Sequence, residues 1–85
     1  MYYVYILYSK KLKKRYIGSS NDLQRRLVEH NSGNCSFTSQ GTPWKLIYYE
    51  VFKFEKDARQ EELFLKSGKG RERIKFLLAE TMKNL

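Results

Sequence analysis

The chain opens on a run of β-branched and aromatic residues whose two alternating faces are both apolar. Residues 2–8 read YYVYILY, which is typical of a strand buried on both sides in the middle of a sheet. The polar SKKLKK follows, and RYIG at 15–18 returns to alternating positions. Two such runs around a polar stretch predict an antiparallel hairpin with a basic loop, in which residues 2–8 form the central strand.

The hydrophobic period changes from two to about 3.6 residues at Asn21, which predicts a helix. Asn21 with Gln24 three residues later resembles a capping box, and Leu23 and Leu27 mark an apolar stripe. The turn residues NSG at 31–33 end this predicted helix.

The second half of the chain predicts one more strand and further helix. Residues 34–42 are small and polar and predict a loop, after which Pro43 leads into the strand-like run WKLIYYEVF. Helical spacing returns over 55–66, is interrupted at SGKG, and resumes from Arg71. The order β-β-α-β-α-α predicts an α+β fold, a small three-stranded antiparallel sheet flanked by helices.

Length and charge restrict the kind of protein. A chain of 85 residues predicts a single domain over 1–85, with no room for a large enclosed cavity. The net charge of +8 favours a polyanionic partner. No apolar run approaches the roughly 20 residues of a membrane-spanning helix, and no signal-peptide pattern is present, so we expect a cytoplasmic protein without a membrane partner.

The cysteine and histidine counts restrict the sites that the chain can build. Cys35 is the only cysteine and His30 the only histidine, which argues against an internal disulfide and against structural zinc. Cys35 lies in a polar stretch with no second histidine to pair with it, so a bystander role is favoured over a nucleophile. A hard cation held by carboxylate oxygens is compatible with this composition.

Helical phase separates the two adjacent arginines. At about 100° per residue from Leu23, His30 falls at about −20° and Arg26 at about −60°. Arg25 falls at about 200°, on a solvated face with Glu29. An inward guanidinium such as that of Arg26 needs a water-filled cleft or an anionic partner, for which a carboxylate of the third strand or the second helix is the ordinary alternative.

Period two places Tyr16 and Gly18 on one face of the second strand, and Gly18 leaves room for a substrate or a backbone to approach. Tyr5 lies on the neighbouring strand. A hairpin register that brings Tyr5 near Tyr16 would gather two phenols beside the inward face of the helix. The alternative is that both are ordinary sheet tyrosines, since the chain has seven.

The order of these motifs resembles the GIY-YIG nuclease domain, a family that includes the nucleotide-excision-repair nuclease subunit and homing endonucleases. VYIL, then ten residues between Tyr5 and Tyr16, then YIGSSNDLQRRLVEHNSG, is similar to the two halves of the family motif. EHNSG, PxxLIYYE and LKSGKGR are similar to segments of the small stand-alone members. Two departures are Tyr3 at the first glycine of the motif, and Ser19 and Ser20 where some relatives carry a lysine.

The resemblance implies an endonuclease that hydrolyses DNA phosphodiester bonds with a divalent cation, Mg²⁺ or alternatively Mn²⁺, in DNA repair or recombination. Matched by position, the implied site residues are the tyrosines Tyr5 and Tyr16, the catalytic Arg26, His30 and the metal ligand Glu62. Geometry alone does not choose Glu62, and Glu61 stays as its alternative. Tyr16, Tyr5 and His30 all stay open as the general base.

Other polar residues are candidates for contacts with the nucleic-acid backbone: Ser20, Lys69 and Arg71. The SGKGRER segment that holds two of them lacks P-loop spacing and does not follow a strand. Larger family members gain specificity from appended domains, so we expect it here from a partner protein or self-association. The alternatives are a non-catalytic nucleic-acid-binding module with the same fold and a tyrosine-rich protein-interaction domain.

Overall fold

The structure, a computed structural model, describes residues 1–33 and 37–85. Three strands form one antiparallel sheet in the order β2-β1-β3, with β1 at Tyr2–Ser9, β2 at Lys14–Ser20 and β3 at Trp44–Phe52. The prediction that the first strand is central is therefore confirmed. The expectation for Cys35 lies outside the described residues.

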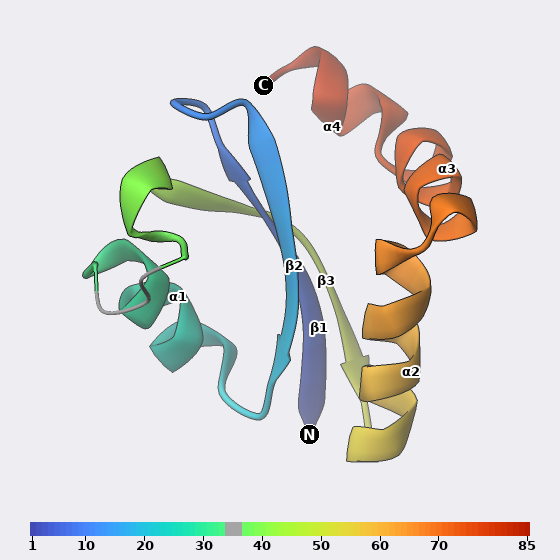
Figure 1. The fold of residues 1–85 in the computed structure, drawn as a ribbon. Coiled ribbons are helices and arrows are strands. Elements are labelled where there is room, and N and C mark those ends of the chain that lie inside the picture. The colour runs from blue at the N-terminus through green and yellow to red at the C-terminus, as the bar shows by residue number, and fades with distance from the viewer. Residues whose placement is uncertain (34–36) are drawn as a thin grey trace.

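Helices cover both faces of this sheet, and Figure 1 looks onto β2 with one helical layer on each side. The helix α1 (Leu23–Asn31) and the short 3₁₀ turn η1 (Ser39–Gly41) lie on one side. On the other side lie α2 (Glu55–Lys66), α3 (Gly68–Leu77) and α4 (Ala79–Lys83). The predicted α+β class and element order are confirmed. None of the described helices has the length and apolarity that crossing a bilayer requires.

Alternation along β1 divides the core into two clusters. Val4 and Ile6 pack against the α2 and α3 side, together with the buried Ala58, Leu65, Ile74 and Leu78. Tyr5 and Leu7 face the α1 side with Trp44. A central strand with helices on both faces buries side chains on both of its faces, as at residues 4–7 of β1, which is the physical reason that its sequence shows no polar alternation.

The first helix begins one residue later than its capping pattern predicts. The N-cap is Asp22, whose side chain accepts a hydrogen bond from the backbone amide of Arg25 at 3.0 Å. The side chain of Asn21 instead accepts a hydrogen bond from the Arg25 guanidinium. The predicted cap at Asn21 was wrong because Asp and Asn are both good caps, and local pattern alone does not choose between neighbours.

The break between the second and third helices is also shorter than predicted. Ser67 alone separates α2 from α3, and its hydroxyl accepts a hydrogen bond from the amide of Gly70. Gly70 lies directly against the α2 backbone at Phe64 and Leu65, where a Cβ would not fit. The predicted restart at Arg71 was wrong because Gly70 lies inside α3 and serves this close helix contact. The last predicted helix is divided at Leu78 into α3 and α4.

Candidate functional site

Tyr5 runs from the central strand across Gly18 toward the edge strand β2. The two residues are cross-strand partners, and a Cβ at position 18 would lie 2.5 Å from the Tyr5 hydroxyl oxygen. Glycine is therefore the residue that lets the phenol pass. The Tyr5 side chain is buried, with 1% of its surface exposed. Its hydroxyl thus lies at the rim where β2 meets α1.

The Tyr5 hydroxyl forms a hydrogen bond with the only histidine of the chain. The hydroxyl oxygen is 2.9 Å from Nε2 of His30, and Nδ1 of His30 is 2.9 Å from Oγ1 of Thr38. Burial, followed by the charge of Arg26, lowers the pKa of the fully buried His30. The imidazole is therefore neutral at neutral pH. Thr38 was not predicted, because its contact with His30 depends on the tertiary structure and not on a local pattern.

Arg26 lies at the same rim, on α1. Its Nη1 donates a hydrogen bond to Oε1 of Glu29 at 2.9 Å, and its side chain is 31% exposed against 58% for Arg25. This difference agrees with the inward and outward phases that the sequence predicts. The expected alternative partner on the third strand or the second helix was wrong, because Glu29 lies one turn away on the same helix. Glu29 also lies 3.7 Å from Nε of Arg25.

Tyr16 is the half-buried member of the aromatic group. Its ring centroid lies 4.8 Å from that of His30 and 6.4 Å from that of Tyr5. The hairpin pairs Tyr16 with Leu7, so Tyr5 and Tyr16 are diagonal neighbours rather than direct partners. Tyr16 also lines an open cleft. Of Tyr5 and Tyr16, Tyr16 is therefore the one that is accessible from solvent.

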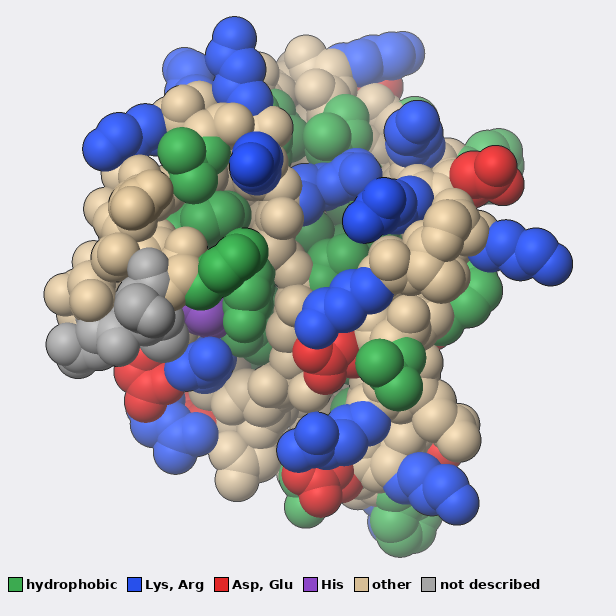
Figure 2. Space-filling model, viewed as in Figure 1, with side chains coloured by type: hydrophobic (Ala, Val, Ile, Leu, Met, Phe, Trp, Pro, Cys, Tyr) green, Lys and Arg blue, Asp and Glu red, His purple; other side chains and the backbone are tan. Residues whose placement is uncertain are grey.

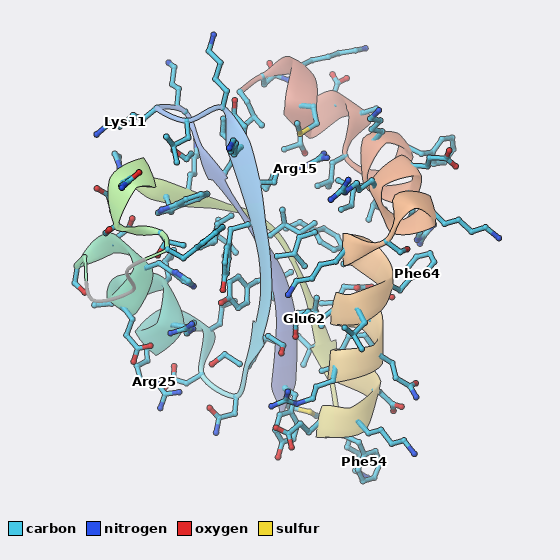
Figure 3. The ribbon with its side chains drawn as sticks, in the orientation of Figure 1. Lys11, Arg15, Arg25, Phe54, Glu62 and Phe64 are labelled. Carbon is cyan, nitrogen blue, oxygen red and sulfur yellow. The ribbon has the colours of Figure 1, made fainter. Side chains whose placement is uncertain are left out.

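Glu62 approaches the same strand from α2, on the other side of the sheet. Its Oε1 accepts a hydrogen bond from Oγ of Ser19 at 2.6 Å, and its Oε2 accepts one from Nζ of Lys66 at 2.7 Å. Burial acts to raise the pKa of Glu62, but the hydrogen bonds from Lys66 and Ser19 outweigh it and the pKa is lowered. Figure 3 shows Glu62 between α2 and β2, with Arg25 on the far side of β2. Glu62 is thus an ionised carboxylate at the β2 edge.

The pKa of the Tyr5 hydroxyl is affected by groups on both sides of the sheet at β2. Burial raises the pKa of Tyr5 to about 12, and a hydrogen bond from Arg26 opposes this rise. The charges of Tyr16 and Glu62 raise the pKa further. Tyr16 of β2, Arg26 of α1 and Glu62 of α2 therefore all affect the pKa of one hydroxyl on β1. Four of the predicted site residues thus interact electrostatically.

The neighbouring carboxylate, Glu61, faces away from this group. A hydrogen bond with Glu50 of β3 is the largest cause that raises the pKa of Glu61, to about 7. Oε1 of Glu50 is buried and has no hydrogen-bond partner among the described residues. The adjacent carboxylates of α2 thus point to opposite edge strands, Glu62 to β2 and Glu61 to β3.

The three candidates for backbone contacts lie in different surroundings. Ser20 and Arg26 line a polar hollow of about 390 Å³ at one end of β2, where the Ser20 hydroxyl accepts a hydrogen bond from the amide of Asp22. Arg71 lines a larger cleft together with Tyr16. Lys69 is exposed on α3 and is not among the residues that line either of them. Two of the three candidates therefore border the tyrosine and arginine group.

The donor set at the β2 edge suits a hard divalent cation. Mg²⁺ in proteins keeps several waters and is held by one or two carboxylates together with substrate phosphates. Glu62 supplies one ionised carboxylate, and Ser19 and Tyr16 bring hydroxyl oxygens to the same strand. The described residues contain no group of three His, Cys, Asp or Glu side chains that could hold a metal unaided. A cation here would therefore complete its shell with water and substrate.

Phenols, a guanidinium, an imidazole and a carboxylate thus surround one edge strand of a small three-stranded α+β domain. The chain belongs to the GIY-YIG family, since the family model described as the GIY-YIG catalytic domain matches residues 1–75.

Relatives carry the name UPF0213 protein. The chain is 31% identical over 84 residues to one of Clostridium perfringens, covering 98% of this chain and 89% of the relative. It is 36% identical over 84 residues to one of Streptococcus pneumoniae, covering 98% and 84%. A third, from Bacillus pumilus, is 42% identical over 53 residues, which cover 61% of this chain and 54% of the relative. No solved structure matches the chain significantly.

Proposed function

We propose that this protein is a metal-dependent endonuclease that hydrolyses phosphodiester bonds in DNA, in repair or recombination. The main support is that Tyr5, Tyr16 and His30 lie together at β2, with the Tyr16 ring centroid 4.8 Å from that of His30. Glu62 reaches the same strand from α2 through its hydrogen bond with Ser19, and a hydrogen bond from Arg26 acts on the Tyr5 hydroxyl. Membership of the GIY-YIG family and a net charge of +8 support a nucleic-acid substrate.

Arg26 supplies positive charge where the scissile phosphate would lie. A guanidinium presents a planar set of donors that matches phosphate oxygens, and it stabilises charge that develops in the transition state. The hydrogen bond to Glu29 holds the Arg26 side chain in one orientation at the rim. Arg26 therefore both positions the phosphate and stabilises the reaction.

Glu62 would hold the divalent cation, Mg²⁺ or Mn²⁺, at the β2 edge. When bound, such a cation polarises a phosphoryl oxygen and activates a coordinated water. The Lys66 ammonium, which lies 2.7 Å from Glu62 in this structure, would turn to the incoming phosphate. Ser19 keeps the carboxylate aimed at β2 through its hydrogen bond to Oε1.

Tyr16 is the candidate proton acceptor for the attacking water, a role that its hydroxyl can take only after it has given its own proton to solvent. Tyr5 and His30 are both buried, so a water molecule has no direct access to either. With the Tyr5 hydroxyl as the donor to Nε2 of His30, the Nδ1 proton of His30 would face Thr38, and a hydrogen bond from Arg26 acts on the Tyr5 oxygen. Tyr5, His30 and Thr38 thus position the guanidinium and the Tyr16 ring.

A cleavage assay tests this proposal. Branched, nicked and linear DNA are incubated with the purified chain in Mg²⁺, Mn²⁺ or EDTA, and the products are resolved on denaturing gels. We expect cutting that depends on the metal. Arg26→Ala should slow it by about 10²-fold or more, and Glu62→Gln should lower it at least as much, because each removes charge that acts on the transition state.

The chain offers matched controls for both variants. Arg25→Ala and Glu61→Gln remove the same chemical groups from the adjacent positions, where Arg25 is 58% exposed and Glu61 is hydrogen-bonded to Glu50 of β3. Both should cut at close to the wild-type rate. Cutting that persists in the Arg26→Ala and Glu62→Gln double variant would reject the proposal. Salt-sensitive DNA binding without cutting in any metal would favour the non-catalytic binding module.

A further inference from the structure

Cationic side chains line one cleft beside the candidate site. The cleft encloses about 850 Å³ and is bordered by the β1–β2 hairpin and the helices α2, α3 and α4. Its cations are Lys13, Lys14, Arg15, Lys66, Arg71 and Lys75, and we call this set and the space between them the basic cleft. No acidic side chain is among the described residues that line it. Figure 2 shows Lys and Arg side chains gathered there around hydrophobic ones.

Most of these charges have no counterpart within the molecule. Lys66 is paired with Glu62, and in the described part of the chain none of the other five forms an ion pair. Some cations elsewhere on the surface are paired on their own helices, as with Arg59 and Glu55 or Lys83 and Glu80, while scattered lysines such as Lys45 form no ion pair with another described residue and do not gather in one cleft. Like charges that face one cleft repel one another and do not stabilise the fold. Their arrangement is therefore explained better by an external polyanion.

The floor of the basic cleft is apolar rather than charged. It is formed by Tyr8, Tyr16, Ile17, Ala79 and Met82, with Phe37 at the side of Tyr16. The Phe37 ring is 80% exposed, and its centroid lies 5.9 Å from that of Tyr16. Cations around an apolar, aromatic floor match a nucleic-acid strand, in which phosphates alternate with sugars and bases.

The basic cleft is continuous with the candidate site through two residues. Tyr16 belongs to both, and Lys66 lines the cleft while its ammonium bonds Glu62. A phosphate held between Arg26 and Glu62 would thus have the next nucleotides of its strand over the cleft.

We propose that the basic cleft binds the sugar-phosphate backbone of the strand that leads away from the scissile phosphate, with Phe37 stacking on a base of that strand. The inference rests on the proposed function only for the identity of the phosphate that is cut. Binding to the basic cleft is measured under conditions in which no cutting takes place. The contacts predict a salt dependence, because each phosphate neutralised on a single strand contributes about −0.7 to the slope of log K against log salt.

The experiment measures binding in EDTA by fluorescence anisotropy, with a labelled oligothymidine strand and a duplex of equal length. A triple variant, Arg15→Gln, Arg71→Gln and Lys75→Gln, should reduce the salt slope on the bound strand by about 2. A matched triple variant, Lys45→Gln, Lys53→Gln and Lys56→Gln, removes the same charge from exposed positions outside the basic cleft and should leave the slope nearly unchanged.

Phe37→Ala tests the stacking contact separately. It should weaken binding of the oligothymidine about tenfold at constant salt slope, because stacking does not release counterions. Thermal melting of each variant checks that the fold is retained, since Arg15 is half-buried while the other substituted side chains are exposed. Equal loss of slope in the two triple variants, or an unchanged slope in the cleft variant, would overturn the backbone contact. Unchanged affinity of Phe37→Ala would overturn the stacking.

The two proposals fail in different ways. Cleft-dependent binding by a chain that cuts no DNA would support the basic cleft and reject the proposed nuclease function. If the triple variant in the cleft changes neither cutting nor binding, the proposal for the basic cleft is rejected and the proposed nuclease function is retained.

Discussion

Replacing Gly18 by alanine perturbs the contact that brings the Tyr5 hydroxyl to the β2 edge. The added Cβ would lie 2.5 Å from the hydroxyl oxygen and 2.7 Å from Cζ of Tyr5, and 3.1 Å from Cε1 of Tyr16. Tyr5 has little room to move, since it is 1% exposed and bonded to His30 at 2.9 Å. Overpacking of this kind typically costs about 1–3 kcal/mol.

The expected result is a lower melting temperature and weaker cutting. For a domain of this size each kcal/mol lowers Tm by about 4–8 °C, so Gly18→Ala should lower it by about 4–24 °C. Circular dichroism on heating measures this shift. Cutting assayed well below the new Tm should fall by up to about 10²-fold, because a displacement of about 1 Å near the reacting groups has that effect.

Two further variants test whether the contact with Tyr5 explains the expected loss of stability. Gly68→Ala places a methyl group where nothing lies within 4 Å, at the start of α3, and should leave Tm unchanged or raise it. In a Tyr5→Phe background the closest contact is absent, so Gly18→Ala should cost less there, with a coupling of about 0.5–3 kcal/mol. A Tm within 1 °C or so of wild type, or an equal cost in both backgrounds, would refute the contact with Tyr5.

Three further predictions concern the buried polar groups. Because the pKa of Glu61 is raised from 4.5 to about 7, the folded state holds its proton more tightly, and stability should fall as pH rises through this window. Glu61→Gln should flatten that part of a Tm-against-pH profile, and an unchanged profile would argue against a proton shared with Glu50. NMR titration of His30 should give a midpoint below 6.5, with the proton on Nδ1; a midpoint above 6.5 would contradict its burial. Tyr5→Phe should destabilise the chain by about 1–3 kcal/mol in chemical denaturation, since Nε2 of His30 loses its partner; no loss would show that water replaces it.

Local periodicity was sufficient for the elements and for part of the site. The doubly apolar pattern of residues 2–8 identified the central strand, because only a strand covered on both faces loses its polar alternation. Helical phase distinguished Arg26 from Arg25, because 100° per residue separates adjacent side chains on any helix. Both features depend only on residues within a single strand or helix, which is why the local sequence determines them.

Contacts between distant segments decided the rest. Phase placed Glu61 and Glu62 on either side of one helical stripe, and only the sheet assigns them, since Ser19 of β2 meets Glu62 and Glu50 of β3 meets Glu61. Thr38 forms a hydrogen bond with His30 only in the folded chain, because the two residues lie on different segments.

The basic cleft belongs to the same category. Its cations are spread from Lys13 to Lys75 in the chain and share a surface only after the β1–β2 hairpin and the helices α2 and α3 have packed. The packing of these elements and the order of the strands decide which charges lie on one surface. The hydrophobic period of a single element contains no information about either. The sequence by itself therefore determined the elements and the faces of the α1 arginines, and the tertiary structure decided which carboxylate and which cations accompany them.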